Sequence, residues 1–210
     1  MTGKDTYHHG DLRRALMDGA LALVRERGLQ ALSLREVASQ VGVSAAAPYH
    51  HFADKAALVR ALGFEALGEL DRRMAEAEAE ADAPDDPLER LMAIGGAYVR
   101  FAMERPDYAA VMRAPEMTEP AAAVGQPEHG LSWERLVGAV VACQQAGVLA
   151  PGDPMPLTIG MWALVQGLAE LMASPAAAAS VPGDPNVFAD FVLRTMIPRA
   201  TSAGPSSARS

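Results

Sequence analysis

Residues 33–55 read SLREVASQVGVSAAAPYHHFADK, and this stretch carries the signals of two short helices joined by a tight turn. Ser33 and Glu36 have the spacing of a capping box, in which a hydroxyl and a carboxylate satisfy free amides at the start of a helix. Gly42 is expected to end that helix, and Ser44 is a candidate cap for a second one. The stretch therefore predicts a helix-turn-helix unit.

Helical spacing continues on both sides of this unit. Upstream, apolar residues recur on one face of a helix that Gly28 ends; they are Leu12, Leu16, Ala20, Leu23 and Val24. Downstream, the second helix is expected to end near Phe52, and Asp54 to cap a long linker helix. We expect a three-helix domain over residues 7–54 and a linker helix after it.

The rest of the chain also has helical spacing, and we find no alternating pattern typical of a strand. Asp86 and Pro87 suit the start of the next helix, as a cap and a first residue. Further helices are predicted at about 88–105, 107–113, 131–146, 156–173 and 185–198. Residues 115–130 predict a mobile loop, and residues 200–210 a disordered tail. The expected fold is all-α with about nine helices, and residues 55–199 form its larger helical domain.

Composition and cysteine content exclude several classes of protein. Half of the residues are apolar, but no stretch approaches the roughly 18 uninterrupted apolar residues of a membrane span. Residues 1–9 are polar and lack the apolar core of a secretory signal. Cys143 is the only cysteine, so the chain has neither a disulfide framework nor a cysteine-based zinc site. We expect a cytoplasmic protein.

The net charge of −8 is unevenly distributed. Residues 1–60 hold eight Lys/Arg and six Asp/Glu, a net charge of +2, together with four of the five histidines. Residues 61–210 hold ten Lys/Arg and twenty Asp/Glu, a net charge of −10. An acidic body with a mildly basic head directs the head toward a polyanion, although +2 is a small charge for this role.

A helix-turn-helix can place its second helix in the major groove of DNA, and the composition of that helix fits this role. Ser44 can offer a hydroxyl and free amides to a phosphate, and the alanines at 45–47 let the tip approach base edges. Polar tips for phosphates come from Tyr49, His50 and His51. Lys55 adds a point charge for the DNA backbone. The alternative is a three-helix packing unit with a merely solvated polar face.

Three segments together resemble the DNA-binding domain of the TetR family. They are Tyr7-His8-His9-Gly10-Asp11-Leu12, the run from Leu34 to Val43, and Ala47-Pro48-Tyr49-His50-His51-Phe52 followed by Lys55. The resemblance covers about residues 7–60 and is specific, because order, spacing and residue types agree. It implies a homodimer that binds a palindromic operator in double-stranded DNA. Family members are usually repressors, released from DNA by a ligand in the C-terminal domain.

The candidate DNA contacts are Arg35, Ser44, Ala45, Ala46, Tyr49, His50, His51 and Lys55. Phe52 is instead expected to pack the recognition helix onto the core. Pro48 stands where the family often has leucine and has no amide hydrogen, so we expect a recognition helix that is distorted or begins late. Alanines can touch thymine methyl groups but cannot hydrogen-bond to bases, so DNA shape is expected to carry much of the specificity.

His50, His51 and Asp54 do not predict a metal site. Adjacent histidines on a helix point about 100° apart and cannot easily share one ion. We predict no metal and no cofactor.

In the C-terminal part, the segment from Trp162 to Leu171 resembles the penultimate helix of a TetR subgroup that has a Trp-x-x-x-x-Gly-Leu pattern. In the family, the last two helices form a four-helix dimer interface. Gly160 and Gly167 lie on one helix face and permit close approach of another helix. The apolar faces available are Leu157, Leu164, Leu168, Leu171, Phe188, Phe191, Val192 and Thr195. The alternative for each residue is an intramolecular core.

Methionines and aromatic residues together suit an adaptable apolar ligand pocket. The candidates for its lining are Tyr98, Met103, Tyr108, Met112, Trp133 and Trp162, with Met117 as a further one. The shortage of basic residues disfavours a multiply anionic ligand, so the expected effector is small and apolar. Ordinary core is the alternative for each of them, and it is the simplest role for Cys143.

The leading interpretation is a ligand-responsive transcriptional regulator, a repressor in which ligand favours a dimer that no longer matches successive major grooves, about 34–36 Å apart. An activator would have the same sequence features, and a dimerisation module without DNA binding is a further alternative. A helical enzyme is the alternative from another class. Against it, the sequence lacks a phosphate loop, a nucleophile elbow and a metal-ligand cluster. We predict no catalytic residue.

Overall fold

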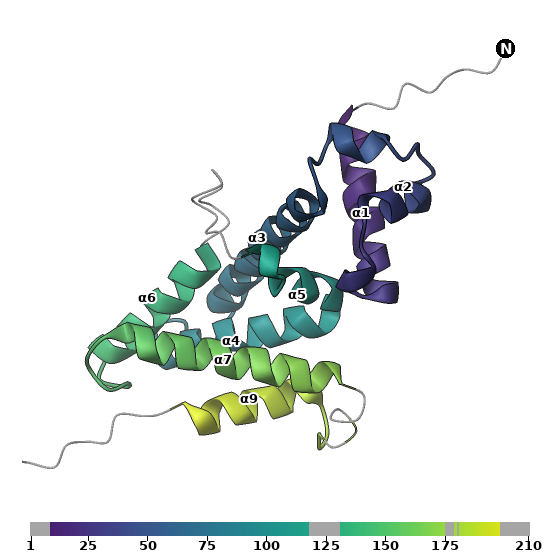
Figure 1. Cartoon of the computed structure of the whole chain (residues 1–210). Coiled ribbons are helices and arrows are strands. Elements are labelled where there is room, and N and C mark those ends of the chain that lie inside the picture. The colour runs from purple at the N-terminus through teal and green to yellow at the C-terminus, as the bar shows by residue number, and fades with distance from the viewer. Residues whose placement is uncertain (1–8, 118–130, 175–178, 180, 198–210) are drawn as a thin grey trace, which may run out of the picture. The chain divides into compact units, whose positions relative to one another are not determined.

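The computed structural model describes residues 9–117, 131–174, 179 and 181–197 (Figure 1). Within these ranges it contains α-helices and short 3-10 helices but no strand, which confirms the expected all-α class. The α-helices are α1 (His9–Arg27), α2 (Leu34–Val41), α3 (Lys55–Ala79), α4 (Pro87–Glu104), α5 (Pro106–Met112), α6 (Leu131–Gln145), α7 (Pro154–Ala173) and α9 (Pro185–Met196). The 3-10 helices are η1 (Leu29–Ala31), η2 (Ala47–His50) and η3 (Pro115–Met117).

The chain forms two compact units. Among the described residues, the first comprises residues 9–69 and 104–117, and the second comprises residues 70–103 and those described from 131 to 197. Helix α3 therefore begins in the first unit and ends in the second, and α5 belongs to the first. The expected domains are continuous stretches of sequence that meet between residues 54 and 55, whereas each packing unit combines separate stretches. The expected boundary stays a prediction. The expected tail from residue 200 and most of the expected loop lie outside the described residues, as do Tyr7 and His8.

Local signals begin and end α2 as the sequence predicts. The hydroxyl of Ser33 accepts a hydrogen bond from the backbone N–H of Glu36, with N and O 3.2 Å apart. The Glu36 carboxylate pairs with Arg27 at 3.4 Å, so only the first half of the expected capping box is recorded. Gly42 ends the helix with a φ of 77°, a conformation that costs glycine little because it has no Cβ.

Aspartate caps begin the later helices. The Asp54 carboxylate accepts a hydrogen bond from the backbone N–H of the third residue after it, at 2.7 Å, and so caps α3 as expected. Asp86, directly before Pro87, caps α4 by accepting a hydrogen bond from the backbone N–H of the second residue after it, at 2.8 Å. Asp153 and Asp184 cap α7 and α9, and a proline follows each of them at the first helical position.

The expected recognition helix from Ser44 to Phe52 is wrong in length and type. Residues 45 and 46 form a turn, and η2 is a single 3-10 turn whose N-cap, Ala46, has no side-chain hydrogen bond. Pro48 gives the physical reason, because it donates no amide hydrogen to an α-helical ladder. The distortion expected from Pro48 is confirmed, whereas the expected cap at Ser44 is not. If η2 is counted as the recognition helix, the described ranges contain the nine expected helices, namely η2 and eight α-helices.

The core of the first unit lies around α1, which contacts both α2 and α5. Leu16 and Leu23 of α1 and Val37 of α2 are completely or almost completely buried. A Cβ on Gly19 would lie 2.7 Å from Cγ2 of Val41, so this glycine permits the close approach of α1 and α2. The helices of the predicted helix-turn-helix are therefore held by a shared apolar core.

The second unit is built on packing among its last helices, since α6 contacts α7 and α7 contacts α9 (Figure 1). Val99 and Phe101 of α4 and Val140 of α6 are fully buried. Helix α7 is long and apolar enough to cross a membrane, with a mean hydropathy of 1.2. Core helices pass the same test, and α7 packs on two neighbouring helices here, so this is weak evidence for a membrane span.

Cys143 of α6 is part of this core. Its side chain is fully buried, and its Sγ donates to the carbonyl oxygen of Pro87 across 3.1 Å. Burial raises the pKa of the thiol to about 11. Both observations favour the structural role over a redox role.

We expect Cys143 to resist alkylation by iodoacetamide at pH 8 in the folded protein. With a pKa of about 11, roughly one thiol in a thousand is ionised at this pH, and the folded protein also blocks access of the reagent. Mass spectrometry should show slow labelling of the native protein and fast labelling in urea. Equal rates in the two conditions would contradict the buried position.

Candidate nucleic-acid interface

The recognition segment has an exposed side and an anchored side. Tyr49 is 53% exposed and His50 is also exposed, whereas Pro48 and Phe52 are buried. The guanidinium of Arg13 lies 5.3 Å from the centre of the Phe52 ring, in reach of a cation–π interaction. The expected packing role of Phe52 is confirmed. Because its apolar neighbours are anchored, Tyr49 is held outward.

The turn before η2 and the start of α2 are also exposed. Ser44, Ala45 and Ala46 are all accessible to solvent. Arg35 is exposed near the start of α2, and the described part of the chain shows no partner for its guanidinium. Since α2 contacts η2, these candidates come from two adjoining elements.

His51 and Lys55 are half-buried. The Nζ of Lys55 donates a hydrogen bond to the carbonyl oxygen of Leu29, 3.3 Å away, and so ties the start of α3 to η1. No sequence pattern indicates this contact. An ammonium group has three N–H donors, so the amine retains donors for a phosphate. Among the described residues, no group of three or more His, Cys, Asp or Glu could hold a metal ion.

Charged contacts attach α5 to the helices of the first unit. Arg25 of α1 donates to the carboxylate of Asp107 of α5 across 2.6 Å, and the Asp107 side chain has no exposed area. The hydroxyl of Tyr108 donates to the Glu65 carboxylate of α3, and Arg14 of α1 donates to the same carboxylate across 2.8 Å. Burial raises the pKa of Tyr108. Helix α5 is thus fixed to the unit that carries the recognition segment.

The six predicted pocket residues are dispersed over the two units. Trp133 of α6 and Trp162 of α7 meet edge to face with ring centres 6.2 Å apart, and both are exposed. Tyr98 is buried in the second unit and Tyr108 in the first. The half-buried members are Met103 and Met112. None of the six lines either of the two clefts described in the second unit, so this pocket stays a prediction.

The predicted dimer residues divide by exposure. Phe191 is 64% exposed, and Leu171 and Thr195 are exposed as well. Leu168 is only 5% exposed and belongs to the intramolecular core, the alternative considered for it. The half-buried members are Leu157, Leu164, Phe188 and Val192.

The structure adds apolar residues that the sequence pattern missed. Exposed on the same two helices are Ile159, Val187 and Met196. Val187 precedes Phe191 by one helical turn, so a four-residue spacing could have found it. An apolar cleft of about 300 Å³ continues this surface and is lined by Pro156, Leu157, Gly160, Met161, Leu164, Met196 and Ile197. We call the exposed residues Ile159, Leu171, Val187, Phe191 and Met196 the α7–α9 face.

Two family models match the chain. "Bacterial regulatory proteins, tetR family" matches residues 16–62. "Tetracyclin repressor-like, C-terminal domain" matches residues 91–196, which are half of the chain. The chain belongs to the TetR family. The resemblance seen in three N-terminal segments is thereby confirmed, whereas the subgroup suggested by Trp162 to Leu171 stays a prediction.

Curated relatives of this TetR protein match over part of their length. The HTH-type transcriptional regulator BetI of Brucella suis biovar 1 (strain 1330) is 32% identical over 92 residues, which are 44% of this chain and 46% of BetI. The HTH-type transcriptional repressor KstR2 of Mycobacterium tuberculosis (strain CDC 1551 / Oshkosh) is 37% identical over 82 residues, which are 39% of this chain and 40% of KstR2. The matches thus span less than half of these curated relatives.

Solved structures match over nearly the whole chain. A protein with unknown function from Rhodococcus sp. RHA1 has a TM-score of 0.72 and 32% identity, over 91% of this chain and 96% of that one. AibR, solved in complex with isovaleryl coenzyme A and operator DNA, has a TM-score of 0.68 and 19% identity, over 89% of this chain and 98% of AibR. The likeness to AibR shows a shared fold.

Proposed function

We propose that this TetR protein is a ligand-responsive transcriptional repressor that binds a palindromic operator as a homodimer. The observation that carries the proposal is the exposed side of the recognition segment, where Tyr49 stands out between the buried Pro48 and Phe52. Family membership supports it, as does the similarity to the transcriptional repressor KstR2. AibR offers a precedent in the same fold, because it binds both operator DNA and a small molecule.

The chemistry of the exposed residues assigns their roles on DNA. The Tyr49 hydroxyl and the His50 imidazole can donate to phosphates, and the Arg35 guanidinium can reach a phosphate or a guanine edge. Ala45 and Ala46 have only methyl groups, which suit thymine methyls. Because η2 is a single 3-10 turn, a helix dipole adds little here, and side-chain contacts and DNA shape carry the recognition.

The second copy would bind at the α7–α9 face. Phe191 and Val187 are 64% and 68% exposed in the single chain, although large apolar side chains are normally covered. A two-fold interface would bury both residues in each of the two copies. Gly160 and Gly167, both exposed on α7, would let the partner helix approach closely. Such a dimer presents two recognition segments, as a palindrome requires.

Helix α5 is the proposed connection between effector and DNA. By sequence it lies inside the range of the C-terminal family model, but it packs on α1, where Arg25 pairs with the buried Asp107 carboxylate. A ligand that displaces α5 would therefore act directly on the unit that holds the recognition segment. The ligand can release the protein from DNA only if it binds the arrangement with displaced α5 more tightly than the arrangement that binds DNA.

The proposal includes the absence of catalysis and a cytoplasmic location. A repressor acts by equilibrium binding, so it needs no catalytic step. It must also be in the compartment that holds the chromosome.

The salt dependence of DNA binding tests the proposal. Affinity for the DNA upstream of the protein's own gene should fall steeply between about 50 and 200 mM salt, because each phosphate contact releases counterions. Fluorescence anisotropy with a labelled duplex measures it. An enzyme or a pure dimerisation module would show weak binding without such a slope.

Lys55→Ala should weaken binding to every DNA sequence and lower the salt slope by about 1, because one phosphate contact is lost. Anisotropy titrations at several salt concentrations measure both effects. The contact of Lys55 with Leu29 requires a check of thermal stability in parallel. A change in base preference would contradict the assigned role.

Tyr49→Ala should weaken DNA binding about tenfold or more, because a hydrogen bond to a charged phosphate contributes about 1.5–3 kcal/mol. The dimer should persist, since Tyr49 is exposed in the first unit. Anisotropy measures the first effect and sedimentation velocity the second. Dissociation of the dimer would show that Tyr49 is structural.

A further inference from the structure

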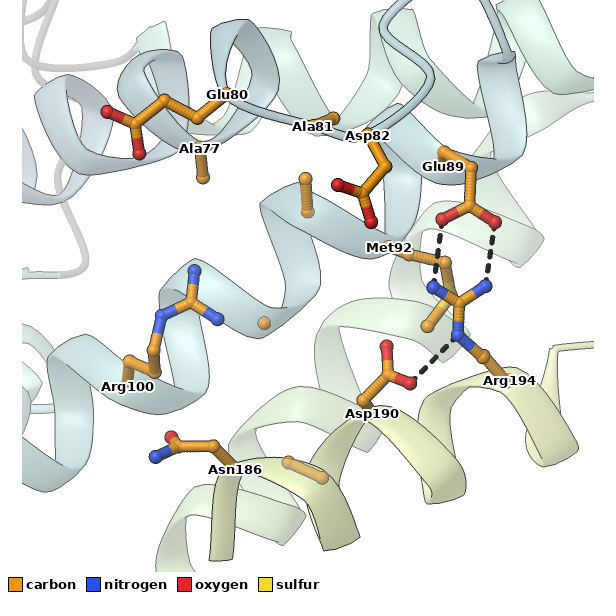
Figure 2. Close-up of a pocket in the computed structure, with 13 residues that line it drawn as sticks. Ala77, Glu80, Ala81, Asp82, Glu89, Met92, Arg100, Asn186, Asp190 and Arg194 are labelled. Atoms are coloured by element: carbon orange, nitrogen blue, oxygen red, sulfur yellow. Dashed lines mark hydrogen bonds and ion pairs between the residues drawn. The ribbon is translucent and has the colours of Figure 1, made fainter.

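The second unit contains a polar cleft that the apolar pocket prediction did not anticipate. It lies between the end of α3, α4 and α9 and has a volume of about 290 Å³ (Figure 2). Small side chains keep it open, namely Ala93 and Gly96 of α4 and Ala189 of α9. Its volume is near the lower limit of small-molecule sites, about 300 Å³, and so fits a small metabolite. We call it the α4–α9 cleft.

One end of the cleft is closed by charges that are already paired. Arg194 of α9 donates two parallel hydrogen bonds to the Glu89 carboxylate of α4, at 2.7 and 2.8 Å (Figure 2). Its Nε donates to Asp190 at 2.8 Å. The hydrogen bonds from Arg194 lower the pKa of Glu89. A guanidinium bound in this bidentate way has little capacity left for a ligand.

The rest of the lining carries charges with no partner. All four residues Arg100, Asn186, Glu80 and Asp82 are exposed to solvent, and in the described part of the chain their side chains show no hydrogen bond or ion pair. The Arg100 guanidinium lies against the backbone of Gly96, since a Cβ built there would be 3.0 Å from its Nη1. In Figure 2 the Asp82 carboxylate points into the space between α4 and α9. Unpaired groups of both signs therefore line one small cleft.

These charges select the ligand. An apolar molecule would remove water from Arg100 and Asp82 and give no hydrogen bond in return. A simple anion would face the carboxylates of Glu80 and Asp82, and a simple cation would leave Arg100 unmatched. The unpaired groups comprise one guanidinium, one amide and two carboxylates. A ligand that matches these groups has one anionic group and at least one ammonium group.

We infer that the α4–α9 cleft binds a small zwitterionic metabolite, with its carboxylate on Arg100 and Asn186 and its ammonium on Asp82. This molecule is the effector of the repressor, a step that rests on the proposed function. The cleft suits an effector because α9 lines it and also carries Phe191 of the α7–α9 face. A ligand that bridges α9 to α3 and α4 would therefore act on the proposed dimer interface.

Calorimetry with ω-amino acids on the full-length dimer tests the site. The probes are 4-aminobutanoate to 8-aminooctanoate, compared with the alkanoate and the alkylamine of equal length. At least one ω-amino acid should bind about tenfold more tightly than either single-charge analogue. Arg100→Ala should reduce it to the level of the alkylamine, and Asp82→Asn to the level of the alkanoate.

Matched controls separate the cleft from general charge effects. Arg60→Ala in the first unit and Glu134→Gln on α6 make the same kinds of change outside the cleft and should bind as the wild type does. Circular dichroism verifies the fold of each variant. The site is refuted if no probe binds at up to about 10 mM, or if Arg100→Ala and Asp82→Asn both bind like the wild type.

A second measurement separates the site from the proposed function. The tightest ω-amino acid should change the affinity for operator DNA at least fivefold, within the usual range of allosteric coupling. An unchanged DNA affinity in a protein that binds both molecules would refute the effector role. A protein that binds the ω-amino acid but no DNA would refute the proposed repressor and leave the zwitterion site established.

Discussion

Phe191→Glu is expected to convert the dimer into monomers. Phe191 is 64% exposed in the single chain, and a two-fold interface on α9 would contain it twice. If each copy is a hot spot of about 2 kcal/mol, the two together contribute about 4 kcal/mol, which corresponds to a roughly thousandfold weaker dimer. Sedimentation velocity at micromolar concentration measures the change. Operator binding should fall with it, because the operator needs two recognition segments.

A matched variant and a second position keep this test decisive. Gln145→Glu introduces the same charge on an exposed position of α6 and should leave the dimer intact. Val187→Glu, one helical turn from Phe191, should repeat the effect if Phe191→Glu fails to fold. Folded Phe191→Glu and Val187→Glu proteins that both remain dimeric would place the interface elsewhere.

Arg25→Ala is expected to lower the free energy of unfolding by about 1–2 kcal/mol, because only the Asp107 side of this salt bridge is buried, whereas Arg25 is 57% exposed and solvent screens its charge. The change removes the shorter of the two arginine contacts of the Asp107 carboxylate and leaves the Nε of Arg105, at 3.4 Å. For a chain of this size, the melting temperature should fall by roughly 2–8 °C. Urea titration and thermal scans measure the two quantities.

Arg14→Ala is the matched control, since it removes an arginine from the same helix. Its partners Asp18 and Glu65 are partly exposed, so we expect a loss of about 0–1 kcal/mol. Adding Asp107→Asn to Arg25→Ala should restore part of the stability, because no charge is then buried. If Arg25→Ala and Arg14→Ala lower the free energy of unfolding equally, the pair of Arg25 and Asp107 stabilises the fold no more than an exposed salt bridge does.

The sequence predicts those parts of the fold that depend on neighbouring residues. Ser33, Gly42 and Asp54 act on amides or dihedral angles within a few residues, so their roles at helix ends can be inferred from spacing. The recognition segment also followed a local rule, because Pro48 disrupts the α-helical ladder there. The helix expected from a cap at Ser44 is too long, because Pro48 donates no amide hydrogen to it.

The sequence does not predict which distant elements cover a side chain. Leu168 and Phe191 both fit an apolar helix face, but tertiary packing buries the first and leaves the second exposed. The pair of Arg25 and Asp107 joins residues 82 positions apart, and no periodicity connects them. For the same reason, methionine and aromatic content favours an apolar effector pocket, whereas the α4–α9 cleft arises from charged residues on α4, on α9 and in the loop after α3.

Selection of bound duplexes from a random DNA pool tests the central claim most directly. The exposed segment around Tyr49, presented twice by a two-fold dimer, predicts an inverted repeat with half-site centres one helical turn apart, about 34–36 Å, or a multiple of it. The Phe191→Glu monomer should not enrich this repeat. Failure of the wild-type protein to enrich any sequence, or enrichment of a motif without two-fold symmetry, would contradict the account.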